Sequence, residues 1–528
     1  MSNNSRTANS IKNIATGFLG QFITTILGFT SRTVFINCLA TEYLGVNGLF
    51  TNILSMLSLA ELGIGTAIIY ALYKPLAEKD ENQIAKLINF YSKAYTCIGI
   101  FVFISGIVLL PFLKFIIRDA PNISESLYVI YIIYLFNTSI SYFFSYKNSL
   151  IVADQKNYIT LLSSYAITMI QTLLQIVALV VTNNFIVYLI VQTICTFINN
   201  LFISIIANKM YPFLKNNKKL KLDQSEKKSL ISNVKALVVV KISGVLVNNT
   251  DNIIITYFEG LTSVGLCSNY NLLIGVIGTA LNQIFNGLTA SIGNLNAKEN
   301  KERREEFFDI LNFCNFWLFG WCAICIVLLI NDVIILWVGK EYVLDISIPI
   351  ILAINFYMVG MQNAVWTYKN TLGIFRQGRY ILFITAGINL VASMYLGGKY
   401  GLFGILLATT ISRLFTNTWF DPYIVYKVGF KKNGKKYFIK YISYIIILLV
   451  SGGITGYLLS LVGVKSYIGF IIKLFICITI PNLIILLMFR RTKEMNYILK
   501  FIKNILIKIL KIKKCLNKVK NIYKYVDN

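Results

Sequence analysis

Three cationic side chains stand inside long apolar stretches of the sequence: Arg32 in GFTSRTVF, Lys241 in VVVKISGVL and Arg413 in ATTISRLFTN. A charge within the hydrocarbon region of a membrane costs roughly 2.5–3.5 kcal/mol on the insertion scale, so it usually faces a polar cavity or a partner. A pyrophosphate needs such cationic partners in a low-dielectric site. The alternatives are that a cation reaches the membrane interface or pairs with a carboxylate, as Arg413 would with Asp421.

Two carboxylates lie in equally apolar surroundings, Glu61 in SLAELGIGTA and Asp251 in NNTDNIII. Either one would suit Na⁺ or H⁺, or would neutralise a neighbouring cation. Three amides flank the second carboxylate: Asn248, Asn249 and Asn252. So polar a segment does not suit a lipid-facing helix. We therefore expect a polar lumen that hydrogen-bonds sugars, with polar contacts between helices as the alternative.

The sequence offers little for catalysis. It has no histidine, and its nine cysteines include no paired zinc motif. It also contains no nucleotide-binding P-loop, no GxSxG and no HExxH. We expect a protein that is not an enzyme and that needs no cofactor other than a coupling Na⁺ or H⁺.

Membrane helices are the elements that must position these residues. Of the 528 residues, 56% are hydrophobic and 14% charged, against roughly 45–50% and 25% in soluble domains. Apolar runs of about twenty residues, enough to cross a bilayer, recur along the chain. We predict about fourteen spans, near 13–39, 46–73, 89–117, 127–150, 158–182, 184–208, 233–258, 264–295, 307–331, 346–371, 379–396, 400–426, 440–462 and 466–489.

The basic residues predict which side of the membrane each loop faces. The net charge is +27, and most of the 50 Lys and Arg residues fall on alternate loops. The basic side is cytoplasmic, so both termini are expected there and nucleic acid is not an expected partner. The tail over 490–528 combines an apolar helical stripe with lysines, which favours an anionic lipid surface, with packing on cytoplasmic loops as the alternative.

An internal repeat divides the chain. KNSL at 147–150 recurs as KNTL at 369–372, and the segment 77–90 resembles 297–313 at nearly the same offset. Two parallel repeats of six spans predict a transporter with a central cavity. We predict an N-terminal lobe over 1–208, a basic linker over 209–232, a C-terminal lobe over 233–426, two extra helices over 440–489 and the basic tail over 490–528.

Several short segments, in this order, resemble the polysaccharide-biosynthesis flippases of the MOP exporter superfamily. They are YLG at 43–45 with GL at 48–49, ELGIG at 61–65, KPL at 74–76, ADQKNY at 153–158, NTDNII at 249–254, VG at 264–265, SNY at 268–270, and WVG at 337–339 with EY at 341–342. The resemblance implies an all-α, MATE-like membrane protein of two pseudo-symmetric six-helix lobes plus two C-terminal helices. The lobes would alternate between inward-open and outward-open states.

The resemblance also implies a function and partners. The substrate would be an undecaprenyl-pyrophosphate-linked oligosaccharide, such as a capsule or O-antigen unit, moved across the bacterial cytoplasmic membrane. Polysaccharide polymerase machinery would be a further partner. In the family, cations of the first lobe hold the pyrophosphate, and Arg32 fits that role by its span.

Other functions compete with this expectation. A lipid II flippase or a cation-coupled drug antiporter of the same superfamily is the nearer alternative. A drug antiporter should have an acidic cavity for cationic cargo, whereas this lumen is expected to be cationic. A membrane-embedded polysaccharide polymerase is the alternative from another class, although no acid–base pair is evident.

Overall fold

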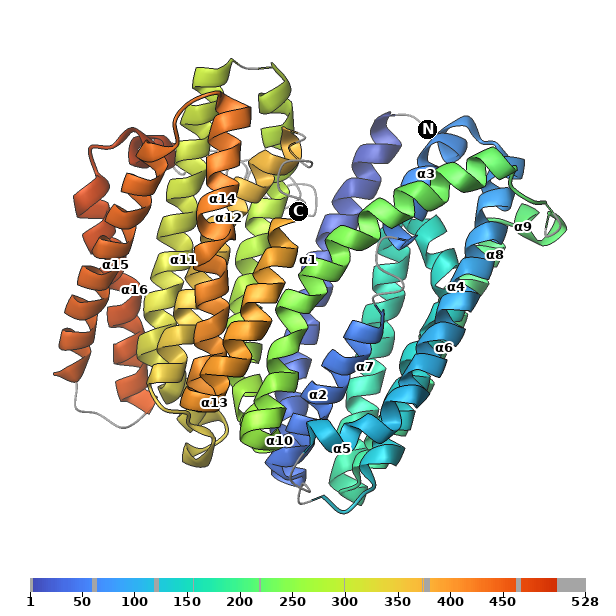
Figure 1. Ribbon diagram of the computed structural model, residues 1–528, viewed down its shortest axis with the longest axis horizontal. Helices are drawn as coiled ribbons and strands as arrows, with labels where there is room; N and C mark the ends of the chain where they lie inside the picture. The colour runs from blue at the N-terminus through green and yellow to red at the C-terminus, as the bar shows by residue number, and fades with distance from the viewer. Residues whose placement is uncertain are drawn as a thin grey trace, which may run out of the picture. The chain divides into compact units, whose positions relative to one another are not determined.

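The computed structural model describes residues 3–58, 64–117, 123–154, 156–217, 220–298, 300–372, 374, 380–461 and 467–500. Throughout these ranges the chain is built from helices, and they contain no strand (Figure 1). Glu61 and the tail after residue 500 lie outside them.

The helices of the first half follow the predicted spans closely. The region predicted as the second span contains two helices, on either side of residues that the structure does not describe. In order, the helices are α1 (Asn3–Cys38), α2 (Thr41–Leu57), α3 (Ile64–Glu78), α4 (Glu81–Leu109), α5 (Leu113–Ile116), α6 (Leu127–Ala153), α7 (Asn157–Thr182) and α8 (Phe185–Met210).

The remaining helices vary widely in length, from the four residues of α9 to the 75 of α10. They are α9 (Phe213–Asn216), α10 (Gln224–Lys298), α11 (Lys301–Trp337), α12 (Ser347–Thr371), α13 (Ile381–Phe415), α14 (Asn417–Ile424), α15 (Lys435–Ser460) and α16 (Tyr467–Phe489). Short 3₁₀ segments lie at Leu110–Phe112 and Lys340–Tyr342, and a π segment lies at Val425–Phe430.

Two of these long helices are each two segments joined at a glycine. Gly260 breaks α10 with φ 80°, and Gly401 breaks α13 with φ 55°. Positive φ carries little steric cost for glycine, which lacks Cβ, but is strained for other residues. The breaks fall near the expected boundaries, between 258 and 264 and between 396 and 400.

The chain is an all-α integral membrane protein. Within its described part, ten helical stretches are long and apolar enough to cross a bilayer, and two of them, Thr250–Phe285 and Ile381–Phe430, each include a glycine break. Large apolar side chains such as Phe115, Val181 and Leu449 are more than 70% exposed, as suits surfaces that contact lipid. The predicted total of fourteen spans stays a prediction.

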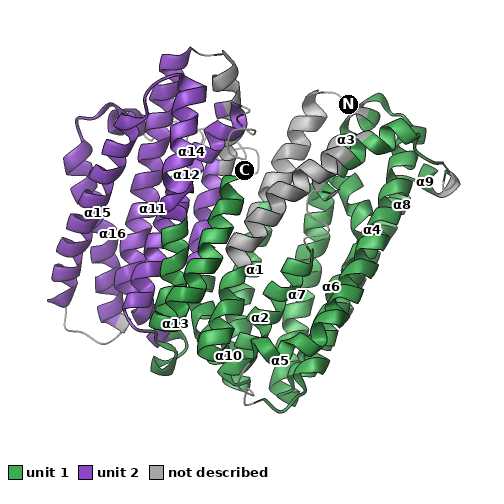
Figure 2. Cartoon of the chain, in the orientation of Figure 1, with its two compact units in different colours: residues 1–272, 337–344, 380–412 green, residues 273–336, 345–379, 413–528 purple. Residues whose placement is uncertain are grey.

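The chain forms two compact units (Figure 2). Unit 1 comprises Met1–Leu272, Trp337–Leu344 and Tyr380–Ser412, and unit 2 comprises Leu273–Leu336, Asp345–Arg379 and Arg413–Asn528. In unit 1, α1 packs on α7, and α6 packs on α4 and α8; in unit 2, α12 packs on α14 and α15 on α16. The units are discontinuous in sequence, and the division into lobes proposed above stays a prediction.

Within unit 1, α2 and the second segment of α10 approach each other backbone to backbone. A Cβ on Gly45 would lie 2.0 Å from the carbonyl oxygen of Leu261, and one on Gly265 would lie 2.6 Å from that of Thr41. Thr41 and Leu261, like Gly45 and Gly265, are related by an offset of about 220 positions. The contact is therefore reciprocal, as at a two-fold axis, and it agrees with the offset of the internal repeat.

Candidate functional site

Arg32 lies near the end of α1 and is held by the second segment of α10. Its Nε donates to Oδ1 of Asn269 at 2.9 Å, and a terminal nitrogen donates to the hydroxyl of Ser268. The guanidinium is partly buried and Asn269 is fully buried. All three residues belong to unit 1.

The local sequence explains why α10 offers acceptors at this point. Ser268 lies one turn after Gly265, the residue that brings α10 against α2, and its hydroxyl donates to the Gly265 carbonyl at 2.6 Å. The Ser268 oxygen then accepts from Arg32. On the same stretch of α1, Trp337 donates to Thr33 at 2.7 Å and packs edge-on against Phe29.

The groups that hold Arg32 are neutral. Within the described residues no carboxylate forms an ion pair with its guanidinium, in contrast to lysines such as Lys369 and Lys440. A neutral amide and a hydroxyl orient the guanidinium without cancelling its charge. The arrangement therefore leaves a positioned positive charge in α1, which the sequence predicts to cross the membrane, and such a charge is what binding of a phosphate or pyrophosphate requires.

The reciprocal contact identifies the repeat equivalent of Arg32. An offset of about 220 positions relates Arg32 to Asn252, and it relates Gly48 to Ser268. In the structure a Cβ on Gly48 would lie 3.8 Å from the Asn252 side chain, which mirrors the contact of Arg32 with Ser268. The two halves thus place a cation and an amide at equivalent positions.

A second polar cluster surrounds Asp251, in the first segment of α10. Thr409 donates to Oδ2 of Asp251 at 3.1 Å, and Asn389 donates to Thr409 at 2.9 Å. Thr250 donates to Oδ1 of Asn389 at 3.4 Å. The cluster joins α10 to both segments of α13, because Asn389 precedes Gly401 and Thr409 follows it.

This Asp251 cluster is deeply buried. Asn389 is 0% and Thr409 6% exposed, and Ser393, one turn after Asn389, is also 0% exposed. The Ser393 hydroxyl has no hydrogen-bond partner among the described residues. Carboxylate, hydroxyl and amide oxygens around a single negative charge are a ligand set for a hard cation, and the carboxylate is also a site for a proton.

For the other residues predicted to bind substrate, the structure shows fewer side-chain contacts or none that can be described. Lys241, Asn248 and Asn249 lie on α10, but their side chains are not among those described. Asn252 is partly buried and its carbonyl oxygen accepts from Thr256 at 2.7 Å. Arg413 is partly buried near the end of α13, and it belongs to unit 2. That these residues bind substrate stays a prediction.

Sequence reasoning missed the partners of the two charged centres. Ser268 and Asn269 were noted only as part of a motif, and Asn389, Ser393 and Thr409 were not singled out. The sequence contains one signal for the polar cluster near Asp251. Asn389 and Ser393 are four residues apart in an apolar span and therefore share a helix face.

In the described part of the chain, no group of three or more His, Cys, Asp or Glu is arranged to hold a metal.

Comparison with known proteins gives a fold but no close relative. No family profile matches the chain, and no curated protein matches it. The lipid II flippase MurJ in an inward closed conformation matches with a TM-score of 0.61 at 15% identity, over 89% of this chain and 98% of MurJ. The MATE multidrug transporter DinF-BH in complex with R6G matches with a TM-score of 0.56 at 16% identity, over 81% of this chain and 96% of its own.

A third match is to a transporter that belongs to a defined superfamily. An inward-facing multidrug resistance MATE family transporter of the MOP superfamily matches with a TM-score of 0.53 at 14% identity, over 74% of this chain and 92% of its own. These matches extend over nearly the whole length of the known transporters. The chain therefore has the fold of the MOP-superfamily transporters.

Proposed function

We propose that the protein is a flippase that moves an undecaprenyl-pyrophosphate-linked oligosaccharide across the bacterial cytoplasmic membrane by alternating access. The observation that carries this proposal is Arg32, a cation in a membrane helix whose partners, Ser268 and Asn269, are neutral. A net positive charge fixed in a low-dielectric site suits an anionic headgroup and disfavours a cationic drug.

In this proposal Arg32 binds the pyrophosphate through charge-assisted hydrogen bonds, while Ser268 and Asn269 hold the guanidinium in position. Lys241 and Arg413 are further candidates for the same group. Asn248, Asn249 and Asn252 would line a polar path for the sugars, while the prenyl chain stays in lipid. Arg32 lies two turns before the end of α1, so the predicted topology places it in the outer half of the membrane, where it favours outward movement of the headgroup.

The proposal includes a coupling ion at the Asp251 cluster. The oxygens of Asp251, Thr409 and Asn389 suit Na⁺, and the single carboxylate alternatively suits H⁺. The ion would join the two segments of α13 to α10, because the cluster has members on each. Glu61 stays a second candidate from the sequence.

The helix α10 supplies a physical link between ion and substrate. It carries Asp251 before the break at Gly260 and the Arg32 partners Ser268 and Asn269 after it. Glycine at positive φ lets the two segments change their mutual angle at low cost. Binding of an ion at Asp251 would then alter the affinity for the anion at Arg32, and the coupling must be reciprocal.

A lipid II flippase is the second candidate. It is favoured by the match to the lipid II flippase MurJ over 89% of this chain, the most complete coverage among the structures described above. Both candidates carry a lipid-linked anionic cargo, so Arg32 has the same role in each.

A flipping assay in proteoliposomes tests the proposal. The cargo is a fluorescent polyprenyl-pyrophosphate oligosaccharide, with lipid II as a second cargo and a cationic dye as a third, under an imposed Na⁺ or H⁺ gradient. We expect Arg32→Ala to reduce flipping by about tenfold or more, as loss of a charge-assisted contact predicts. Lys399→Ala, which removes an exposed lysine whose ammonium donates to Tyr395, is the matched control and should not change flipping.

The three cargoes separate the possible results. Movement of the oligosaccharide in preference to lipid II supports the first candidate, and the reverse supports the second. Dye movement without movement of either lipid would overturn both, as would equal flipping by wild-type protein and Arg32→Ala.

A further inference from the structure

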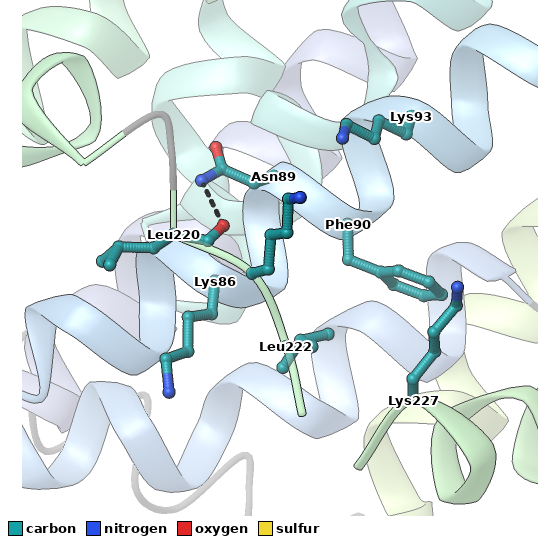
Figure 3. Close-up of a pocket in the computed structure, with 8 residues that line it drawn as sticks. Lys86, Asn89, Phe90, Lys93, Leu220, Leu222 and Lys227 are labelled. Atoms are coloured by element: carbon teal, nitrogen blue, oxygen red, sulfur yellow. Dashed lines mark hydrogen bonds between the residues drawn. The ribbon is translucent and has the colours of Figure 1, made fainter. Parts of the chain in front are cut away.

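A basic cavity lies at the polar end of α4, apart from the two centres described above (Figure 3). Its volume is about 510 Å³. The charged side chains that line it are four lysines: Lys86, Lys93, Lys221 and Lys227. Phe90 and Leu222 add apolar surface. All these residues belong to unit 1.

One wall of the cavity is a face of α4. The helix begins at an N-cap formed by Asp80, whose carboxylate accepts from the backbone N–H of Gln83 at 2.9 Å. Lys86, Phe90 and Lys93 follow at spacings of four and three residues, so they share one side of the helix. The apolar part of α4 begins directly after Lys93, which places this wall beside the membrane surface.

The opposite wall is the linker between α8 and α10, and two amide side chains of α4 fix it in place. Asn89 donates to the carbonyl oxygens of Asn217 at 2.9 Å and Leu220 at 3.1 Å. Gln83 donates to Glu226 at 2.9 Å. The linker and the start of α10 are therefore held against α4. Lys221 of the linker and Lys227 of α10 line the cavity together with Lys86 and Lys93, and Figure 3 shows Lys227 on a different element from Lys86 and Lys93.

The charges of this cavity are not balanced by acids. No carboxylate lines it, and none of its four lysines forms an ion pair with an acidic residue in the described part of the chain. Four lysine side chains along one cavity give it a positive electrostatic potential. A ligand with several negative oxygens would be attracted to that potential, and lysine is a common partner of phosphate.

We propose that this lysine cavity binds a diphosphate group on the side of the membrane predicted to be cytoplasmic. Lys86, at the start of α4, and the linker fall in loops for which the sequence predicts that side, and Lys93 lies just inside the adjoining predicted span. Two sources share this chemistry: a lipid-linked diphosphate whose chain stays in the adjacent bilayer, and a free diphosphate from solution. The site is separate from Arg32 and does not depend on the transport proposed above.

Binding to the purified full chain in zwitterionic nanodiscs tests the proposal without any transport step. Inorganic pyrophosphate and geranylgeranyl diphosphate are titrated separately by calorimetry. We expect binding that weakens by about tenfold in Lys86→Gln/Lys221→Gln, which removes one charge from each wall. The control is Lys431→Gln/Lys435→Gln, which removes two exposed lysines from another basic loop and should leave binding unchanged.

A second variant tests whether a loss of binding comes from the cavity itself and not from misfolding of the lysine variant. Asn89→Leu removes the two hydrogen bonds that fix the linker while leaving every lysine in place, and it should weaken binding if the geometry of the cavity matters. Arg32→Ala is expected to retain the binding lost in the lysine variant, which separates this site from the proposed transport site.

Two results would overturn the proposal: undiminished binding in Lys86→Gln/Lys221→Gln, or an equal loss in the control, which would indicate an effect of net charge alone. The ligands distinguish the source. Tighter binding of geranylgeranyl diphosphate identifies a lipid-linked group, and equal binding of pyrophosphate identifies a free one; either result supports a diphosphate site.

Discussion

At the scale of single residues, charged groups have two kinds of partner. The cation proposed to bind substrate contacts neutral groups, whereas a carboxylate that joins two helices accepts several hydrogen bonds. Arg32 contacts an amide and a hydroxyl. Glu125, in the loop before α6, instead accepts from the Tyr43 hydroxyl, from Ser124 at 2.8 Å and from the backbone N–H of Phe185 at 3.3 Å. This carboxylate therefore joins α2 to the start of α8.

Glu125 gives unit 1 a pH-dependent contribution to stability. Burial raises the pKa of its carboxyl, but the hydrogen bonds from Tyr43, Ser124 and Phe185 outweigh burial, so the pKa is lowered from its ordinary value of 4.5. A lowered folded-state pKa means that the contribution is present above about pH 4.5 and is lost as the pH falls through the lower folded value.

We predict that Glu125→Gln lowers the thermal unfolding temperature in detergent at pH 7, and that the difference from wild type shrinks as the pH is lowered below about 4.5. Differential scanning fluorimetry across pH 3.5–7 measures it. Glu306→Gln, in an exposed pair with Arg303, is the control. A difference that stays constant with pH would contradict the assignment.

At the scale of elements, close helix contacts depend on glycine and on buried ion pairs. The approach of α2 to the second segment of α10 needs a missing side chain at Gly45 and at Gly265. In unit 2, Lys369 of α12 and Asp421 of α14 form an ion pair at 2.6 Å with side chains 15% and 2% exposed. Each contact fixes a pair of elements that the sequence alone does not bring together.

We predict that Gly45→Ala destabilises unit 1 by about 1–3 kcal/mol, the typical cost of overpacking, because its Cβ would collide with the backbone of Leu261. Gly275→Ala is the matched control on α10, since no atom lies within 4 Å of its added Cβ. It should be neutral or slightly stabilising, as alanine is the better helix former. Equal effects in a denaturation series would contradict the close contact.

We also predict that Asp421→Asn destabilises unit 2 by about 3–5 kcal/mol, because it leaves the buried ammonium of Lys369 without a charged partner. The double variant Lys369→Met/Asp421→Leu should recover much of this loss, since two apolar side chains can replace a buried pair. Thermal unfolding of both variants measures the difference. If the double variant is as unstable as the single one, the charge imbalance is not the cause.

At the scale of the whole molecule, one helix connects the two polar centres of unit 1. Here α10 carries both the Asp251 cluster and the partners of Arg32, on opposite sides of Gly260. A cation at Asp251 would also add positive charge to unit 1 and strengthen its attraction for an anion. The proposed coupling therefore depends on α10, which connects the two sites, and not on either site alone.

We predict that the affinity for a polyprenyl pyrophosphate changes by about 5–150-fold between absence and saturation of the coupling ion, the usual range of allosteric coupling, and that the affinity for the ion changes by the same factor. Binding titrations of each ligand at several concentrations of the other measure both. Asp251→Asn should abolish the dependence while retaining binding of the pyrophosphate, whereas Thr409→Ser, which keeps the hydroxyl, should preserve it. A dependence unchanged in Asp251→Asn would place the ion elsewhere.

The class of fold and the main breaks in its long helices follow from the amino-acid sequence. Apolar runs of about twenty residues leave the backbone no partners but its own carbonyls, so helices follow from composition. The expected boundaries near 260 and 400 were confirmed at Gly260 and Gly401. The sequence also singled out Arg32 and Asp251, because charges in apolar segments are rare.

The residues that surround those charges become known from the way the helices pack. Ser268 and Asn269 contact Arg32 across 236 and 237 positions, and Thr409 contacts Asp251 across 158. Such contacts depend on helix packing and rotation, which local periodicity does not encode. The same holds for the lysine cavity, where Asn89 fixes a linker more than 120 positions away. Hydrophobicity sets where the chain crosses a membrane, but packing sets which polar groups meet.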